Sequence, residues 1–382
     1  MMYRTLLAGT TLILGVATTA TGQSATLPLP GTLRAAVGDR MLIGTAIMAQ
    51  DLQDPRHADL ITREFNCLTG GNEFKPDALQ KMKGTFTFEK ADQLVAFAKR
   101  HDMKVVGHTL LWHNQSPAWL FQNADGEPLP REAALANLKD HVAAVIQHFG
   151  NDVVGWDVLN EGITDGDDGY LRDTPARKAI GDDYVVQAFK IAHEANPNVE
   201  LYYNDYNIEN PGKRERALKL IRELKAAGVR LDAVGIQGHW LINFPDAQVL
   251  DDAITEFAAE GVEVMITEMD IDVLPRRSTG ADITLREAGA DPYKEGLPAD
   301  VQQKLAERYK AFFDVIVKHA ADGVVTRVSL WGTTDDHTWL NNFPVRGRTN
   351  HPLLFDRNFA PKPAHAAVLE SLKSLGGASA QN

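Results

Sequence analysis

Eight short apolar runs recur along the chain, and nearly all of them end in polar or aromatic residues. They cover residues 41–47, 65–72, 104–112, 153–161, 199–207, 233–240, 262–270 and 325–332. Several are almost continuously apolar instead of alternating, which is typical of parallel strands that are covered on both faces. The pattern therefore predicts eight buried parallel strands.

Amphipathic stretches with a helical period separate most of these runs. They are FEKADQLVAFAKRH, EAALANLKDHVAAVIQHFG, DYVVQAFKIAHEANP, KRERALKLIRELKAAG, AQVLDDAITEFAAEG, ADVQQKLAERYKAFFDVIVKHA and PAHAAVLESLKSLG. Several stop at Gly or Pro and carry a basic residue near the end, as helix stops do. Repeated strand–helix alternation predicts an α/β fold, a (β/α)8 barrel in a single domain over residues 26–376. An open doubly wound sheet is the alternative, but the GxGxxG fingerprint that often opens such sheets is absent.

The two ends of the chain differ from this domain. Residues 1–25 place Arg4 before a short run of apolar and small residues, which predicts a secretory signal peptide cleaved between about Ala20 and Ala25. Gly and Thr interrupt the run, so a lasting membrane span is not expected, and the alternative is a disordered terminus. We expect a secreted or periplasmic protein, no membrane association after cleavage, and a frayed tail over residues 377–382.

Composition narrows the classes of partner. With 382 residues, of which 44% are hydrophobic, the chain can bury a large core. Cys67 is the only cysteine, so no disulfide can form within the chain. The net charge of −12 argues against nucleic acid as a partner, because phosphate binding needs a basic face. We expect a monomer that acts on neutral substrates.

Two carboxylates stand at the ends of predicted strands. Glu161 ends the fourth strand, in GWDVLNEGI, and Glu268 lies near the end of the seventh. The carboxyl ends of barrel strands share one mouth, where catalytic groups collect. Two carboxylates at this mouth suit glycosidic cleavage, one as the acid and the other as the nucleophile. For either one alone, a structural ion pair is the alternative.

The two carboxyl groups need different neighbours, because one must be ionised and the other protonated. Glu268 must stay ionised to attack a sugar, and His239 can donate a hydrogen bond to it while Asp270 orients the other ring nitrogen. Glu161 must keep its proton near neutral pH, which calls for a less polar setting and a negative charge nearby.

Metal chemistry is not expected at this mouth. His108, His113 and His239 lack the spacing of ligands on a helix, and the chain contains no HExxH motif. The acidic loop over residues 165–169 has Gly169 where a calcium loop needs its fifth-position ligand, so a solvated turn is expected there.

Three tryptophans lie at or just after predicted strand ends: Trp112, Trp331 and Trp339. Each could be a packing residue, but three at one mouth favour a stacking surface for sugar rings.

Taken together, these residues resemble glycoside hydrolase family 10, the retaining endo-β-1,4-xylanases. The likeness covers about residues 40–370, and the motifs that carry it are WHNQSPAWL, WDVLNEG, YYNDYNIE, VGIQGHW, ITEMDI and WGTTDDHTWLNNFPVRGRTNHPLLFD. The resemblance implies a (β/α)8 barrel that hydrolyses xylan or xylo-oligosaccharides and that needs no metal or organic cofactor.

The resemblance also implies a role for each site residue. Glu161 corresponds to the acid/base and Glu268 to the nucleophile, while Asn160 would hydrogen-bond the 2-hydroxyl of the sugar being cleaved. His239 and Asp270 would complete the network around the nucleophile, with Gln237 nearby. The residues implied on the donor side of the cleft are Asn72, Lys75, His108, Trp112, Trp331 and Trp339.

One position departs from the family pattern. GGNEFK has Gly71 where a glutamate is expected, which could weaken donor-side binding by about 1.5–3 kcal/mol unless Glu73 compensates. The departure supports an alternative substrate, another β-glycan or a decorated β-glycoside. The long segment 274–298 is either a tolerated insertion or a determinant of acceptor-side specificity.

Overall fold

The computed structural model describes residues 29–166 and 169–377. The predicted signal peptide, residues 1–25, lies outside the described residues, as do residues 378–382 of the predicted tail. Gly377, which was expected in the tail, instead ends the last helix.

The described residues form a closed barrel of parallel strands. The strand segments are β1 (Leu42–Ile47), β2 (Cys67–Gly70), β3 (Lys104–His108), β4 (Gly155–Asn160), β5 (Glu200–Asp205), β6 (Ala233–Ile236), β7 (His239–Leu241), β8 (Glu263–Asp272) and β9 (Val325–Leu330). Strands β1 to β6 pair in chain order, β6 pairs with β8, and β9 pairs with both β8 and β1. The sheet therefore closes on itself, which confirms the predicted (β/α)8 barrel and excludes the open sheet.

The expected sixth strand, residues 233–240, is wrong as one continuous element. It divides into β6 and β7, and Gly238 between them has φ 83°, a left-handed conformation that glycine adopts without steric cost. The polar ends of other predicted strands are also loop residues, because β3 stops at His108 and β5 at Asp205. These two strands end at a polar residue, whereas β8 continues through Glu268 and Asp270 to Asp272.

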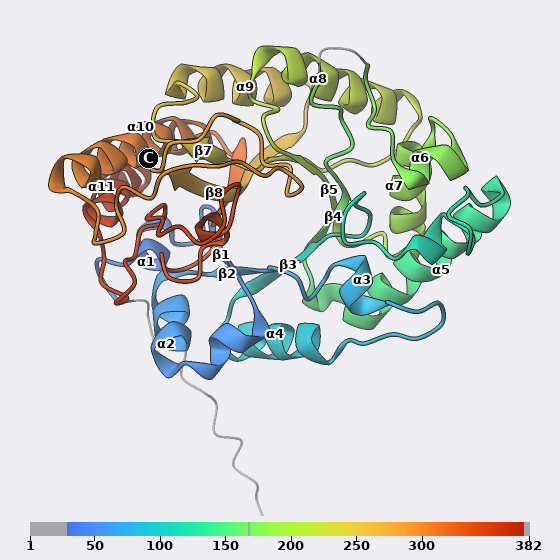
Figure 1. The fold of residues 1–382 in the computed structure, drawn as a ribbon, viewed down its shortest axis with the longest axis horizontal. Coiled ribbons are helices and arrows are strands. Elements are labelled where there is room, and N and C mark those ends of the chain that lie inside the picture. The colour runs from blue at the N-terminus through green and yellow to red at the C-terminus, as the bar shows by residue number, and fades with distance from the viewer. Residues whose placement is uncertain (1–28, 167–168, 378–382) are drawn as a thin grey trace, which may run out of the picture.

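Helices surround the barrel in one outer layer (Figure 1). They are α1 (Leu33–Val37), α2 (Pro55–Glu64), α3 (Pro76–Leu79), α4 (Glu89–Arg100), α5 (Arg131–Phe149), α6 (Pro175–Ile180), α7 (Tyr184–Ala195), α8 (Pro211–Ala226), α9 (Ala247–Ala259), α10 (Ala299–Ala321) and α11 (Pro363–Gly377). Short 3-10 helices are η1 (Ala49–Gln53), η2 (Ala118–Leu120), η3 (Gly150–Asp152) and η4 (Trp339–Asn341). In the described part of the chain, no helix is long and apolar enough to cross a membrane.

Helix α2, the crossover between the first two strands, was absent from the predicted helices. Its start has a recognisable signal, since the Asp54 side chain accepts a hydrogen bond from the Arg56 amide and Pro55 occupies the first turn. Leu60 and Ile61 form part of its buried face. A short helix with few apolar positions gives a weak periodic pattern, which explains the omission.

Close packing joins the sheet to its helices. Trp156 of β4 is fully buried, with its ring centre 5.8 Å from Phe74 and 5.9 Å from Phe149 of α5. The neighbouring strand leaves space for this ring at Gly107, where an added Cβ would lie 2.1 Å from the indole. The glycine is therefore required by the tryptophan beside it.

Candidate active site

The predicted site residues lie at one end of the barrel, where the strands finish and the following loops begin. Glu161 directly follows β4, and Glu268 lies within β8. The supporting residues lie in or beside the neighbouring strands: Asn160 ends β4, His108 ends β3, Gln237 lies between β6 and β7, His239 begins β7 and Asp270 belongs to β8.

Glu161 is 4% exposed and its carboxylate is held on both oxygens. Trp112 donates its indole N–H to Oε2 at 2.9 Å, and Gln237 donates to Oε1 at 3.2 Å. Asn160 donates a longer bond of 3.3 Å to the same Oε1. The backbone of Glu161 has φ 56°, an uncommon conformation for a residue with a side chain, and such conformations cluster at functional sites.

The surroundings of Glu161 favour its protonated form. Burial is the main cause, and the charge of Asp205 adds to it, so that the pKa of Glu161 rises from 4.5 to about 7. The hydrogen bonds from Trp112 and Gln237 act in the opposite direction. A carboxyl with this pKa can donate a proton near neutral pH and accept one afterwards.

Glu268 is equally buried but has the opposite electrostatic setting. Asn204 donates a 2.7 Å hydrogen bond to Oε1, and His239 Nε2 lies 3.2 Å from Oε2. Burial favours the neutral acid, yet the hydrogen bond from His239, the nearby His108 and the bond from Asn204 together lower the pKa of Glu268 below its ordinary value. The carboxylate is thus kept ionised and available as a nucleophile.

His239 is fixed between two carboxylates. Its Nδ1 lies 3.0 Å from Asp270 and its Nε2 faces Glu268. Burial opposes the charged ring, but Asp270 and Glu268 outweigh it and raise the pKa of His239 to about 10. The protonated ring therefore donates a hydrogen bond from each nitrogen.

An amide network connects the two catalytic candidates. One nitrogen of Asn204 donates to Asn160 Oδ1 at 2.9 Å and to Glu268 Oε1 at 2.7 Å. Gln237 donates to Asn160 Oδ1 at 3.2 Å as well as to Glu161. These bonds fix the orientation of Asn160 between the two carboxylates.

The predicted donor-side polar residues also lie together. Lys75 Nζ donates to Asn72 Oδ1 at 3.0 Å and to Gln115 Oε1 at 2.8 Å, and it lies 4.9 Å from the centre of the Trp112 ring. Burial lowers the pKa of Lys75 to about 8, although Glu268 and Glu161 act to raise it.

Trp331 and Trp339 complete this group and are only partly buried. The Trp331 ring lies 5.3 Å from His108, edge to face, and His108 Nδ1 is 2.8 Å from Asp157 Oδ2. Trp339 donates its indole N–H to Asp270 at 2.7 Å and stacks on Phe343 with ring centres 4.3 Å apart. All twelve predicted site residues are therefore connected by direct contacts at one end of the barrel.

Two residues at the end of β5 were not predicted as part of the site. Asn204 links the carboxylates, and Asp205 is fully buried where it accepts hydrogen bonds from Lys213 at 2.8 Å and from Tyr203 at 2.6 Å. The YYNDYNIE motif contains both residues, and their place at a strand end was the signal that could have identified them.

Glu73 does not replace the carboxylate that is missing at Gly71. Its two oxygens accept hydrogen bonds from backbone amides, from Ala49 at 2.9 Å and from Asn72 at 3.1 Å. At Gly71 itself an added Cβ would find its nearest neighbour, Met48, at 3.4 Å, which is an ordinary contact. The position thus has room for a side chain but carries none.

Open space adjoins both sides of the site. A narrow cavity of about 30 Å³ is lined in part by Trp112, Asn160 and Glu161. A second, more open groove of about 360 Å³ is lined by Ile283, Arg286, Trp339, Asn342, Phe343 and Arg346. The 274–298 segment therefore contributes to the groove beside Trp339.

Comparisons with known proteins agree with this geometry. The sequence pattern described as glycosyl hydrolase family 10 matches residues 32–371. The chain is 38% identical over 346 residues to endo-1,4-beta-xylanase A of Xylanibacter ruminicola, covering 89% of this chain and 93% of that protein. It is 38% identical over 339 residues to a beta-1,4-xylanase of Dictyoglomus thermophilum, covering 89% and 90% of the two proteins. A solved endoxylanase of the same family from a sugarcane soil metagenome superposes with a TM-score of 0.83 at 39% identity, over 90% of this chain and 99% of that one.

Proposed function

This chain belongs to glycosyl hydrolase family 10, and we propose that it is an endo-1,4-β-xylanase that cleaves internal β-1,4 bonds of xylan with retention of configuration. One observation carries the proposal. Glu161 and Glu268 are both buried at the barrel mouth, yet the pKa of the first is raised and that of the second is lowered. Two carboxyl groups with opposite protonation states are what a double displacement requires.

In the first step, the ionised Glu268 attacks the anomeric carbon while Glu161 gives its proton to the glycosidic oxygen. The carbon–oxygen bond breaks, the acceptor half of the chain leaves as an alcohol, and a glycosyl ester forms on Glu268. Asn160, whose orientation is fixed by its bond from Asn204, would hydrogen-bond the 2-hydroxyl, an interaction that strengthens toward the transition state.

In the second step, Glu161 acts as a base. Once Glu268 is esterified its negative charge is gone, and the repulsion that helped to raise the pKa of Glu161 is gone with it. Glu161 removes a proton from water, the water oxygen attacks the anomeric carbon, and Glu268 leaves as a carboxylate. Two inversions at one carbon give net retention.

Binding of the sugar chain would rest on the aromatic and polar residues around the carboxylates. Trp331 and Trp339 are partly buried and offer ring surface, whereas Trp112 is 4% exposed and has Lys75 over its ring. Asn72 and Lys75 offer hydrogen-bonding groups on the donor side. Xylose lacks the hydroxymethyl group of glucose, so crowding by Trp339 would select xylan over cellulose.

The proposal includes export and a monomeric enzyme. Residues 1–25 have the character of a secretory signal peptide, and a polymeric substrate must be met outside the cytoplasm. A single barrel that contains every site residue supports action as a monomer, because no residue of the site has to come from a second chain.

The substrate is tested by chromatography of the products from xylan, carboxymethylcellulose and mixed-linkage glucan. We expect short xylo-oligosaccharides from xylan alone. Release of oligosaccharides from a glucan in preference to xylan would support the alternative substrate that Gly71 suggests.

The roles of the two carboxylates are tested by substitution. Glu161→Ala should lose about 10²–10⁴-fold in kcat/KM on xylan, the usual worth of general acid catalysis, and far less on an aryl xyloside whose leaving group needs no proton. Glu268→Gly should abolish turnover of both substrates. Equal losses on the two substrates for Glu161→Ala would contradict the role of Glu161 as the acid. Turnover that survives Glu268→Gly would contradict the role of Glu268 as the nucleophile.

A further inference from the structure

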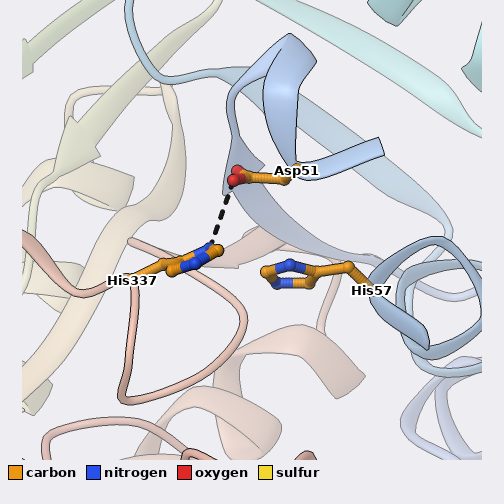
Figure 2. A group of neighbouring side chains, drawn as sticks. All are labelled: Asp51, His57 and His337. Carbon is orange, nitrogen blue, oxygen red and sulfur yellow. Dashed lines mark ion pairs between the residues drawn. The ribbon is translucent and has the colours of Figure 1, made fainter. Parts of the chain in front are cut away.

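Three side chains that can bind metal ions meet away from the catalytic carboxylates. Asp51 lies in η1, His57 in the first turn of α2, and His337 in the loop between β9 and η4 (Figure 2). Their potential ligand atoms all lie within 4.8 Å of one another. None of the three belongs to the catalytic network described above.

His57 is the unusual member of this group. The residue is 1% exposed, and neither of its ring nitrogens has a hydrogen-bond partner within the described chain. Its ring lies 5.0 Å from His337 and 5.1 Å from Phe359, so packing fixes its orientation toward the other imidazole. Burying two unpaired nitrogens is unfavourable, and an ion bound between the side chains would pair the one nitrogen that faces it.

Asp51 is already oriented as a ligand. Its Oδ2 accepts a 2.7 Å hydrogen bond from the Met48 amide, which leaves Oδ1 directed at His337, whose Nδ1 lies 3.2 Å away. Two ligands on a tetrahedral zinc ion are about 3.3 Å apart, because each bond is about 2.0–2.1 Å long. This pair therefore has the required spacing before any ion binds, and only the approach to His57 has to shorten.

We propose that Asp51, His57 and His337 form a binding site for a divalent transition metal such as Zn²⁺. Two imidazoles and one carboxylate are a typical set for zinc, and solvent can supply the fourth ligand because His337 is half exposed. Asp336, whose Oδ2 lies 3.6 Å from His337 Nε2, adds negative charge near the same ring. The set has no resemblance to an oxygen-only site for calcium or magnesium.

The position of the site indicates what the metal would do. Asp51 and His57 follow β1, while His337 follows β9. These are the first and last strands of the barrel, and their pairing closes the sheet. His337 also lies between Trp331 and Trp339 in the chain. A bound ion would therefore join the two loops across this seam and restrain the loop that leads to Trp339, in a chain that has no disulfide to do so.

The test uses the full folded protein, stripped with EDTA and then dialysed. We expect isothermal titration with Zn²⁺ to show one ion per chain, and Co²⁺ to give the visible absorption of a tetrahedral complex. Saturating zinc should raise Tm by about 2 °C or more, since a ligand that binds only the folded state stabilises it. None of these readouts uses activity, so they are independent of the proposed function.

Two variants and one control decide the assignment. His337→Ala removes a half-exposed ring and Asp51→Asn keeps the acceptor for the Met48 amide; each should weaken zinc binding by at least about tenfold and remove the rise in Tm. His193→Ala, which removes an exposed histidine on α7, should bind zinc as the parent does. The proposal is overturned if the parent protein takes up no zinc at millimolar concentration, or if both site variants bind it undiminished.

Discussion

Asn204 shows how a single side chain can serve two carboxylates with different tasks. It donates to Glu268 directly and reaches Glu161 only through Asn160. Glu268 receives its other bond from a protonated histidine, whereas Glu161 is bonded by neutral indole and amide groups and lies close to Asp205. Two residues with the same side chain thus acquire different pKa values from their neighbours alone.

The influence of Asp205 on Glu161 gives a prediction at this scale. Asp205→Asn removes a negative charge that raises the pKa of Glu161 from 4.5 toward about 7. The pKa of Glu161 must then fall, so the acid is deprotonated at lower pH and the alkaline limb of the kcat/KM profile should move to lower pH, by about one unit.

The matched control for this prediction is Asp165→Asn, which also removes a negative charge 2.8 Å from Lys213 Nζ. Asp165 does not contact the Glu161 side chain and is not among the main causes of its raised pKa. Its alkaline limb should stay close to that of the parent. If both variants show the same limb as the parent, Asp205 does not tune the acid.

Gly71 supports a second prediction at the residue scale. Gly71→Glu restores the side chain that the family pattern leads us to expect, at a position with room for a Cβ. A new hydrogen bond to donor-side hydroxyls should lower KM for xylo-oligosaccharides by about tenfold, the effect of 1.5 kcal/mol, with little change in kcat. Gly71→Gln serves as the uncharged comparison, and an unchanged or higher KM in both would show that this position does not face the sugar.

At the scale of elements, the barrel depends on large side chains packing against glycines of the neighbouring strand. Trp156 on β4 occupies the volume that Gly107 on β3 leaves free, and the register places these two residues side by side. The strand that ends in Asn160 is thereby packed against α5 through the same indole. Because Glu161 directly follows β4, the packing of Trp156 also helps to fix the position of Glu161.

The packing of β4 can be tested with two glycines. Gly107→Ala would bring a methyl group to 2.1 Å from the Trp156 ring, and should lower the free energy of unfolding by about 1–3 kcal/mol or more. Gly212→Ala, in the first turn of α8, meets no atom within 4 Å and should be neutral or slightly stabilising. Urea denaturation measures both, and equal stability of the two variants would contradict the packing account.

The sequence allowed some of these elements to be predicted and not others. Strand ends are visible as the point where an apolar run turns polar, so the residue pattern alone was enough to place Glu161 and Glu268 at one mouth. The ion pair of Asp205 with Lys213 depends on how β5 packs against α8, which no local pattern records. The same holds for Asp51, His57 and His337, which lie far apart in the chain and meet only when β9 pairs with β1.

At the scale of the whole molecule, closure of the sheet is what makes the site possible. Residues from β3, β4, β5, β7 and β8 converge because every strand runs parallel and ends at the same mouth. On this geometry rests the proposal that Glu268 forms a covalent bond to the sugar while Glu161 supplies and recovers the proton.

That claim is tested most directly by trapping the intermediate. The protein is incubated with a 2-deoxy-2-fluoro xylobioside that carries an activated aryl leaving group, and intact mass and peptide mapping follow. We predict a mass increase of one fluoroglycosyl unit per chain, located on the peptide that contains Glu268 and absent from Glu268→Gly. A label on any other residue, or an unlabelled protein that releases product with inverted configuration, would contradict the account.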